Sequence, residues 1–251
     1  MFQINNFLNN KNMKIIAQMG PFRVFEHEKD LSVLPGRAVE AYYSSQMNLR
    51  KRQVFVELAS GGCVLQAGAM QWMLGNVTME TGVKGVGNLL GKMASAAVTR
   101  ETAIKPIYRG NGVMMLEPTY KHIILLDVSQ WGSVVLDDGL FLACQESLQQ
   151  KVVARTNLSS AVMGGEGLFN LSLIGNGVAV LESPVPMEEL IEVNLENDVL
   201  KIDGNMAIAW SGSLNFSVEK SGKSLIGSAV SGEGLVNVYR GTGKILMAPT
   251  L

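Results

Sequence analysis

The side chains that most often do chemistry in proteins are few and scattered in this chain. Its 251 residues include two histidines, His27 and His122, and two cysteines, Cys63 and Cys144. None of them has a partner at the spacing of a metal-binding or redox motif. Because transition metals need three or four imidazole, thiolate or carboxylate ligands, we expect no bound metal and no cofactor.

Two Gly-Lys pairs suggest a phosphate-binding loop, but neither fits the motif. A nucleotide P-loop needs a glycine five positions before the Gly-Lys glycine and a Ser or Thr after the lysine. Around Gly91-Lys92 these places hold Val86 and Met93, and Gly222-Lys223-Ser224 has Ser217 where the first glycine is needed. The chain also lacks a Gly-x-Ser-x-Gly nucleophile motif.

Three glutamates recur at nearly constant spacing: Glu101, Glu166 and Glu233. They could be a carboxylate set for acid–base catalysis. Equivalent positions in repeated units would, however, be held apart by the repeat geometry, so we assign them a structural role at turns. We therefore predict that the protein is not an enzyme.

Each glutamate precedes a Gly-x-Gly sequence, and these sequences define a repeat. The first two copies are displaced by 65 positions and the third by 66 more. A fixed period indicates one structural unit used three times. The predicted repeat turns are Gly110 and Gly112, Gly175 and Gly177, and Gly241 and Gly243.

A second landmark gives the same period. Asp138-Gly139 and Asp203-Gly204 are also 65 apart, and we take Pro35-Gly36 as the first copy. Unit one then carries about 38 extra residues, because Gly36 lies 103 positions before Gly139. We assign the units to residues 14–118, with an insertion near 61–99, to 119–183 and to 184–251.

The elements that carry these landmarks are short and apolar, which predicts an all-β fold. Segments of four to eight apolar or alternating residues are separated by turn dipeptides, and the chain has 27 glycines. Asn111-Gly112 and Asn176-Gly177 predict type I′ hairpin turns. We expect three β-sandwich or short double-stranded β-helix units arranged around a pseudo-threefold axis.

The insertion in unit one departs from this pattern. Apolar residues in it are spaced by three and four, which places them on one side of a helix, although glycines at 82, 85, 87 and 91 oppose helix formation. We predict a weak helix, or a loop that orders on contact. This candidate interaction surface comprises Val83, Val86, Leu90 and Met93 with Lys84 and Lys92. A protein partner or self-contact suits it better than peripheral membrane contact, since two lysines give little attraction to lipid.

Composition excludes several classes of protein. A net charge of −1 offers no field for a polyanion, so nucleic acid is not an expected partner. No stretch has the roughly 20 apolar residues of a membrane span, and the Asn-rich first residues do not resemble a signal peptide. With two isolated cysteines, we expect a soluble protein of the reducing cytoplasm.

Some of these motifs resemble a known family. Gly165-Glu166-Gly167 followed by Gly175-x-Gly177, and Gly232-Glu233-Gly234 followed by Gly241-x-Gly243, resemble the altered-inheritance-of-mitochondria family over residues 14–250. In bacteria this is a widespread domain of unknown function. Unit one departs from the pattern, since Arg100-Glu101-Thr102 replaces a Gly-Glu-Ser type of sequence.

The resemblance implies a triplicated double-stranded β-helix, similar in fold to the tryptophan RNA-binding attenuation protein. It also implies no established enzymatic activity, and its eukaryotic members are associated with mitochondrial membrane organisation. Fold similarity to an RNA-binding protein does not imply RNA binding.

We therefore expect a non-catalytic binding or scaffold protein that forms a homo-oligomer, with Met70, Trp72, Met73 and Leu74 as interface candidates. The alternative is a small-molecule-binding or enzymatic β-barrel with its site inside one unit or at the pseudo-threefold axis. A deep pocket with convergent polar groups would favour the alternative.

Overall fold

The computed structural model describes residues 2–81, 105–154, 169–220 and 235–249, and within them the chain is predominantly β-structure. The first lobe contains β1 (Met13–Met19), β2 (Phe22–His27), η1 (Pro35–Arg37), α1 (Ala38–Gln46), β3 (Arg52–Glu57), η2 (Leu58–Ser60), β4 (Cys63–Leu65), β5 (Met70–Glu80) and β6 (Ile107–Leu116). The second contains β7 (His122–Asp127), η3 (Val128–Trp131), β8 (Ser133–Leu136), β9 (Phe141–Gln145), β10 (Gln149–Ala154), β11 (Phe169–Ile174) and β12 (Val178–Ser183). The third contains η4 (Met187–Glu189), β13 (Ile191–Asp203), β14 (Ala207–Ser211), β15 (Asn215–Lys220) and β16 (Leu235–Met247).

The strands form two antiparallel sheets that curve into nearly closed, barrel-like lobes. The nine-stranded sheet has the order β1-β2-β3-β6-β4-β9-β12-β7, with β5 also paired to β6. The seven-stranded sheet has the order β10-β11-β8-β14-β16-β13, with β15 also paired to β16. Each sheet crosses a boundary between lobes, because β4 pairs with β9 and β8 pairs with β14.

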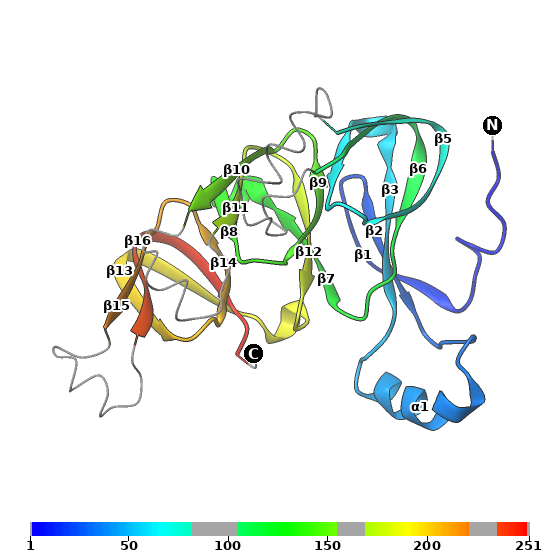
Figure 1. The fold of residues 1–251 in the computed structure, drawn as a ribbon, viewed down its shortest axis with the longest axis horizontal. Coiled ribbons are helices and arrows are strands. Elements are labelled where there is room, and N and C mark those ends of the chain that lie inside the picture. Colours follow the sequence, from blue (N-terminus) through cyan, green and yellow to red (C-terminus); the bar gives the residue numbers. More distant parts are fainter. Residues whose placement is uncertain (1, 82–104, 155–168, 221–234, 250–251) are drawn as a thin grey trace, which may run out of the picture.

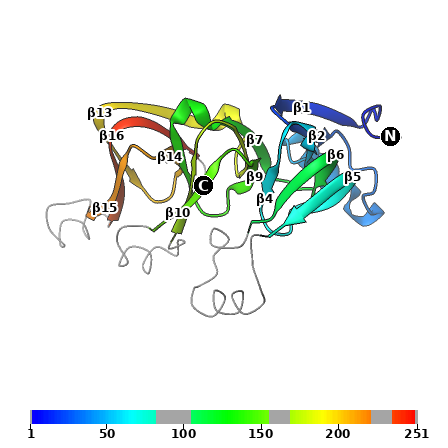
Figure 2. The same ribbon diagram turned by 90° about the horizontal axis from the view of Figure 1, so that it is seen from above.

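The lobes stand in a row, with the second between the first and the third (Figure 1). Figure 2 shows the same order from above, with β13 and β16 at one end and β1 and β2 toward the other. Among the described strands, no pairing joins the first lobe to the third. The structure therefore differs from the expected arrangement around a threefold axis.

Each lobe is filled by its own apolar side chains, and neighbouring lobes share parts of their cores. The core of the second lobe includes Val64 from the first lobe and Leu246 from the third. Both junctions are made by antiparallel strand pairs, β4 with β9 and β8 with β14. The three lobes are therefore joined into one body, the β body, by shared core residues and by paired strands.

The repeat glycines share a backbone conformation. Gly110, Gly175 and Gly241 have φ of +127°, +115° and +121°, values that favour glycine over residues with a side chain. A second set at the Asp-Gly landmark, Gly139 and Gly204, has φ of +78° and +71°.

In the first lobe a similar φ, +81°, occurs at Gly68, whereas Gly36 does not have positive φ. Gly36 lies in η1, because Pro35 fixes a φ suited to the first position of a helix. Residues 63–65 and 70–80, which fall within the expected insertion, are the regular strands β4 and β5. The rest of the insertion, including its predicted helix, lies outside the described residues.

The Gly-x-Gly sequences do not form type I′ hairpins. Gly110-Asn111-Gly112 lies inside β6, and Thr242 continues β16 in the third lobe. Neither Asn111 nor Asn176 has positive φ. The second glycine is needed for close approach, since a Cβ at Gly112 would lie 2.3 Å from the Leu74 carbonyl oxygen.

Candidate interaction site at the N-terminal arm

The thiols that sequence analysis singled out are buried inside the lobes. Cys63 and Cys144 are both fully covered, and burial raises the pKa of both thiols, that of Cys144 to about 12. They lie on paired strands but contribute to different cores, Cys63 to that of the first lobe and Cys144 to that of the second. Neither thiol can supply a thiolate nucleophile at neutral pH.

The two histidines are also separate. His27 Nε2 lies 3.1 Å from Gln53 Oε1, and Gln53 in turn donates to Gln71 Oε1 at 3.0 Å. Burial, and secondarily Arg52, lower the pKa of His122. Within the described ranges, no three His, Cys, Asp or Glu residues are placed to hold a metal ion.

The other predicted residues divide into two groups. Glu101, Glu166 and Glu233, and the surface made of Val83, Val86, Leu90, Met93, Lys84 and Lys92, lie outside the described residues. The turn glycines are described, and two of them adjoin matching hydrogen bonds: Ser147 Oγ donates to the Asn176 carbonyl and Ser213 Oγ to the Thr242 carbonyl, both at 2.9 Å. These hydrogen bonds fix the backbone next to the glycines, which is consistent with a structural role for the turns.

The predicted interface strand β5 is covered in part by the N-terminal segment. Trp72 contacts the Phe7 ring edge to face at 6.2 Å between centroids, beside Phe25 and Phe55. Met73 is 43% exposed. This strand is therefore a less continuous apolar surface than its sequence indicates.

Sequence analysis missed the segment that protrudes most clearly from the body, residues 28–51, which we call the arm. It connects β2 to β3 and carries α1, which Figure 1 shows extending away from the sheets. The helix ends in a Schellman motif, because Leu49 N donates to the Ser44 carbonyl, Asn48 N donates to that of Ser45, and Asn48 has φ of +62°. Pro35 before the helix and Asn48 after it are the sequence signals that could have revealed it.

The arm exposes its apolar side chains. No residue of α1 is buried. Seven large apolar or aromatic residues of the arm are about half or more exposed: Leu31, Leu34, Val39, Tyr42, Tyr43, Met47 and Leu49. An apolar cluster of this kind is typical of a surface that another molecule covers.

The base of the arm is fixed by a buried ionic network. The Arg52 side chain is 2% exposed; its guanidinium pairs with Glu26 at 2.7 Å and donates to the carbonyl and the side-chain oxygen of Asn48 at 3.1 and 2.9 Å. The Arg52 backbone also exchanges two hydrogen bonds with Thr119. Arg52 thus ties the end of α1 to both β2 and the β6–β7 connection.

A second ion pair joins the two ends of the arm. Lys51 Nζ lies 2.7 Å from Asp30, which also accepts hydrogen bonds from the backbone and hydroxyl of Ser32. Lys51 is the main cause of a lowered pKa at Asp30, and Asp30 is the main cause of a raised pKa at Lys51. Both groups are therefore charged at neutral pH.

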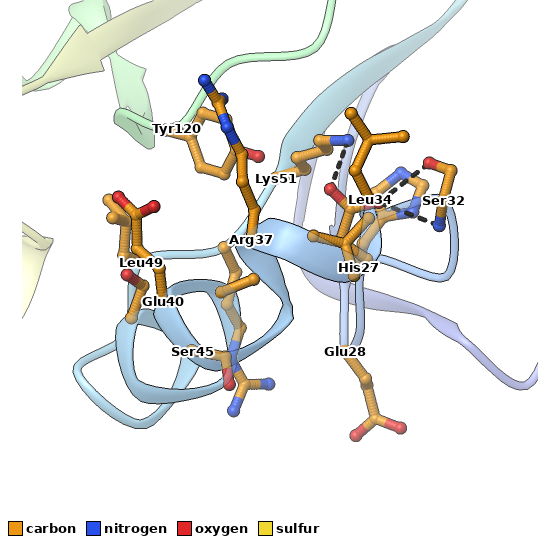
Figure 3. Close-up of a pocket in the computed structure, with 15 residues that line it drawn as sticks. His27, Glu28, Ser32, Leu34, Arg37, Glu40, Ser45, Leu49, Lys51 and Tyr120 are labelled. Carbon is orange, nitrogen blue, oxygen red and sulfur yellow. Dashed lines mark hydrogen bonds and ion pairs between the residues drawn. The ribbon is translucent and has the colours of Figure 1, made fainter.

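Between the arm and the body lies a cavity of about 570 Å³ (Figure 3). His27 and Tyr120 line it from the body, and the arm residues around it include Leu34, Arg37, Leu49 and Lys51. Figure 3 shows Glu28 pointing away from Lys51 and Tyr120. Two of the charged side chains that line the cavity, Lys51 and Asp30, already form an ion pair with each other.

Comparison with known proteins supports the family resemblance. Residues 43–250 match the family described as mitochondrial biogenesis AIM24. The uncharacterized protein M6_Spy0233 of Streptococcus pyogenes serotype M6 is 32% identical over 201 residues, which cover 76% of this chain and 79% of that protein. The crystal structure of protein SPYM3_0169 from Streptococcus pyogenes has a TM-score of 0.57 and 28% identity, covering 80% of this chain and 88% of that one.

The family match begins inside α1, so β1, β2 and the first half of the arm precede it. None of the helices in the described ranges is long and apolar enough to cross a membrane. The match includes most of the first lobe and all of the second and third. The chain belongs to the mitochondrial biogenesis AIM24 family.

Proposed function

We propose that the protein is a non-catalytic scaffold whose continuous β body presents the arm to a protein partner. The observation that carries this proposal is the exposure of α1, a nine-residue helix with no buried residue and several exposed apolar side chains. Helices in proteins are normally stabilised by burying one face. A helix that buries none within its own chain has that face available for another molecule.

The chemistry of the body supports a non-catalytic role. Its two thiols are buried and protonated, and its most buried cation, Arg52, already has ionic and hydrogen-bonding partners. The lobes are filled with apolar side chains, so the cavity lies beside the first lobe and not inside a barrel. Because both cysteines are free and face different cores, a reducing compartment such as the cytoplasm suits the protein.

We further propose that the lobes are three copies of one unit. The shared φ values of the glycine sets, the matching serine hydrogen bonds and the antiparallel strand pair at each junction support this origin. Neighbouring copies extend each other's sheets, which makes a stiff support for the arm.

A second candidate function is the binding of a small molecule in the cavity beside the arm. Its volume of about 570 Å³ is within the range of ligand sites. Its lining combines Tyr120 and Leu34 with charged groups, which would suit a small amphipathic molecule. Any such site would depend on the arm, since arm residues form one wall.

The experiment that tests the scaffold proposal is removal of the arm tip. Residues 31–47 would be replaced by a short Gly-Ser linker, which keeps Asp30, Lys51 and the Arg52–Glu26 pair. The shortened protein should keep its β-type circular dichroism and its cooperative unfolding while losing its association in sedimentation velocity. A shortened protein that associates as the wild type does, or a wild type that stays monomeric at tens of micromolar, would count against the proposal.

A further inference from the structure

We infer that the partner of the arm is a second copy of this chain, and that the arm docks on the acidic surface formed by η4 and β13. This inference rests on the scaffold proposal and specifies its partner. It predicts a twofold dimer in which each arm covers the acidic surface of the other copy.

The acidic surface combines negative charge with exposed apolar side chains. Between residues 187 and 203 the sequence has six carboxylates and a single lysine, Lys201. Met187, Ile191 and Val199 are 47%, 44% and 43% exposed on the same elements. The carboxylates are Glu188, Glu189, Glu192, Glu196, Asp198 and Asp203.

No ion pair within the described ranges neutralises the carboxylates of η4. Among the described residues, neither Glu188 nor Glu189 makes an ion pair, and Glu192 lies 4.0 Å from Lys244. The charges of β13 also protect this edge strand from pairing with another strand. The surface is therefore suited to side-chain contacts with a basic, apolar partner and not to extension of the sheet.

The arm has the complementary properties. Besides its exposed apolar residues it carries Lys29 and Arg37, both exposed and without an ion pair among the described residues, and one exposed carboxylate in α1, Glu40. The other arm cations, Arg50 and Lys51, pair with Glu26 and Asp30 at the base. Lys29 and Arg37 outnumber Glu40, so the arm keeps a small positive excess that can meet carboxylates elsewhere.

The two surfaces are neighbours on one side of the molecule. Arg52 at the base of the arm pairs with Thr119, which lies just before β7. His122 of β7 pairs with Ser183 of β12, which lies just before η4, so η4 lies near that base. Figure 1 shows α1 and the short yellow turn between β12 and β13 on the same lower side of the row. Tyr120, which is 50% exposed, follows β6 and borders the cavity beside the arm.

A patch with a basic apolar half and an acidic apolar half is self-complementary under a twofold rotation. An isologous interface requires that residue i of one copy meets residue j of the other, and j meets i. Here the arm meets η4 twice, which doubles the buried apolar area and the number of charge contacts. A net charge of −1 provides little repulsion between copies.

Charge-reversal variants test this inference directly. The arm variant is K29E/R37E, the acidic-surface variant is E188R/E189R, and K151E on β10 is the control with a single charge reversal at another exposed site. Each of the first two variants alone should dissociate at least about tenfold more readily than the wild type in sedimentation equilibrium at low salt, because like charges then face each other at both contacts. The control should dimerise as the wild type does.

Mixing the two variants gives the decisive result. A heterodimer of the arm variant and the acidic-surface variant has opposite charges at both contacts, so the mixture should regain dimers that neither variant forms alone. If the wild type is dimeric and both variants remain dimeric, or if mixing restores nothing, the inference is overturned while the scaffold proposal survives. A wild type that is monomeric at every concentration overturns both.

Discussion

The lobes and the arm of this protein are stabilised by different means. The lobes bury continuous apolar cores and join their sheets across each boundary, whereas the arm buries none of its helix and is fixed at its base by ion pairs. Burial supports a fold independently of other molecules, while an exposed helix with a fixed base keeps its surface free. The comparison indicates that the lobes serve as the support and the arm as the contact.

The largest contrast is expected from matched leucine truncations. Leu173 is fully buried in the core of the second lobe, whereas Leu34 in the arm is 69% exposed. Leu173→Ala should lower the free energy of unfolding by about 4 kcal/mol, because it leaves a cavity in a packed core. Leu34→Ala should change it by less than about 0.5 kcal/mol. Urea denaturation measures both, and similar values would remove the distinction between lobe and arm.

The next effect concerns the junction between the two regions. Arg52→Met leaves Glu26 without its main partner at a nearly buried site and should cost about 3 kcal/mol. The exposed pair Lys121–Glu182 is the control, and Lys121→Met should cost less than about 1 kcal/mol. Limited proteolysis should also cut the Arg52→Met variant within residues 28–51 before it cuts the lobes. An arm that stays resistant would show that Arg52 does not fix it.

Within the lobes, substitutions at Gly68 and Gly110 distinguish the stability cost of backbone strain from the stability cost of a steric clash. Gly68 has positive φ but open space around its Cβ position, whereas a Cβ at Gly110 would lie 2.1 Å from the Asn76 carbonyl oxygen. Gly68→Ala should cost about 1 kcal/mol, from backbone strain, and Gly110→Ala about 2 kcal/mol or more. Thermal unfolding of the two variants would contradict this account if Gly68→Ala were the less stable.

The smallest expected effect concerns an ion pair of the third lobe, where the second lobe has an apolar residue instead. Arg240 pairs with Glu219 in the third lobe and lowers the pKa of that carboxylate to about 2, while Ile174 takes the corresponding place in the second lobe. The stabilisation from this pair is complete above the ordinary glutamate pKa and is lost as the pH falls toward 2. Glu219→Gln should therefore unfold at a slightly lower temperature than the wild type at pH 7, with the difference vanishing near pH 2. A difference that persists at pH 2 would exclude the ion pair as its cause.

The sequence predicted the all-β class and the family because both depend on local patterns that recur. Within the described ranges, short apolar segments bounded by turn residues form strands, and Gly110, Gly175 and Gly241 adopt the positive φ that glycine allows. The turn type was wrong because Gly112 serves a close approach of two strands, a contact that depends on residues distant in the sequence.

The arm could not be predicted with the same patterns. The helix is only nine residues long and buries none of them, so its few apolar positions, such as Val39, Tyr42 and Tyr43, give too short a pattern for helical periodicity to detect. Gly36, taken from the sequence as the first copy of the Asp-Gly landmark, lies in the arm and lacks the positive φ of Gly139 and Gly204, whereas Gly68 has it. The ionic network at Arg52 joins residues from three parts of the chain, which sequence spacing alone does not reveal.

The central claim is that the arm is a contact surface distinct from the body, and amide hydrogen exchange measured at two protein concentrations tests it most directly. In dilute solution the amides of α1 should exchange quickly and those of β12 and β16 slowly, because α1 buries nothing while these strands lie inside the sheets. At concentrations where the chain associates, the α1 amides should become protected and the strand amides should not change. Association that leaves α1 exchange unchanged would contradict the account.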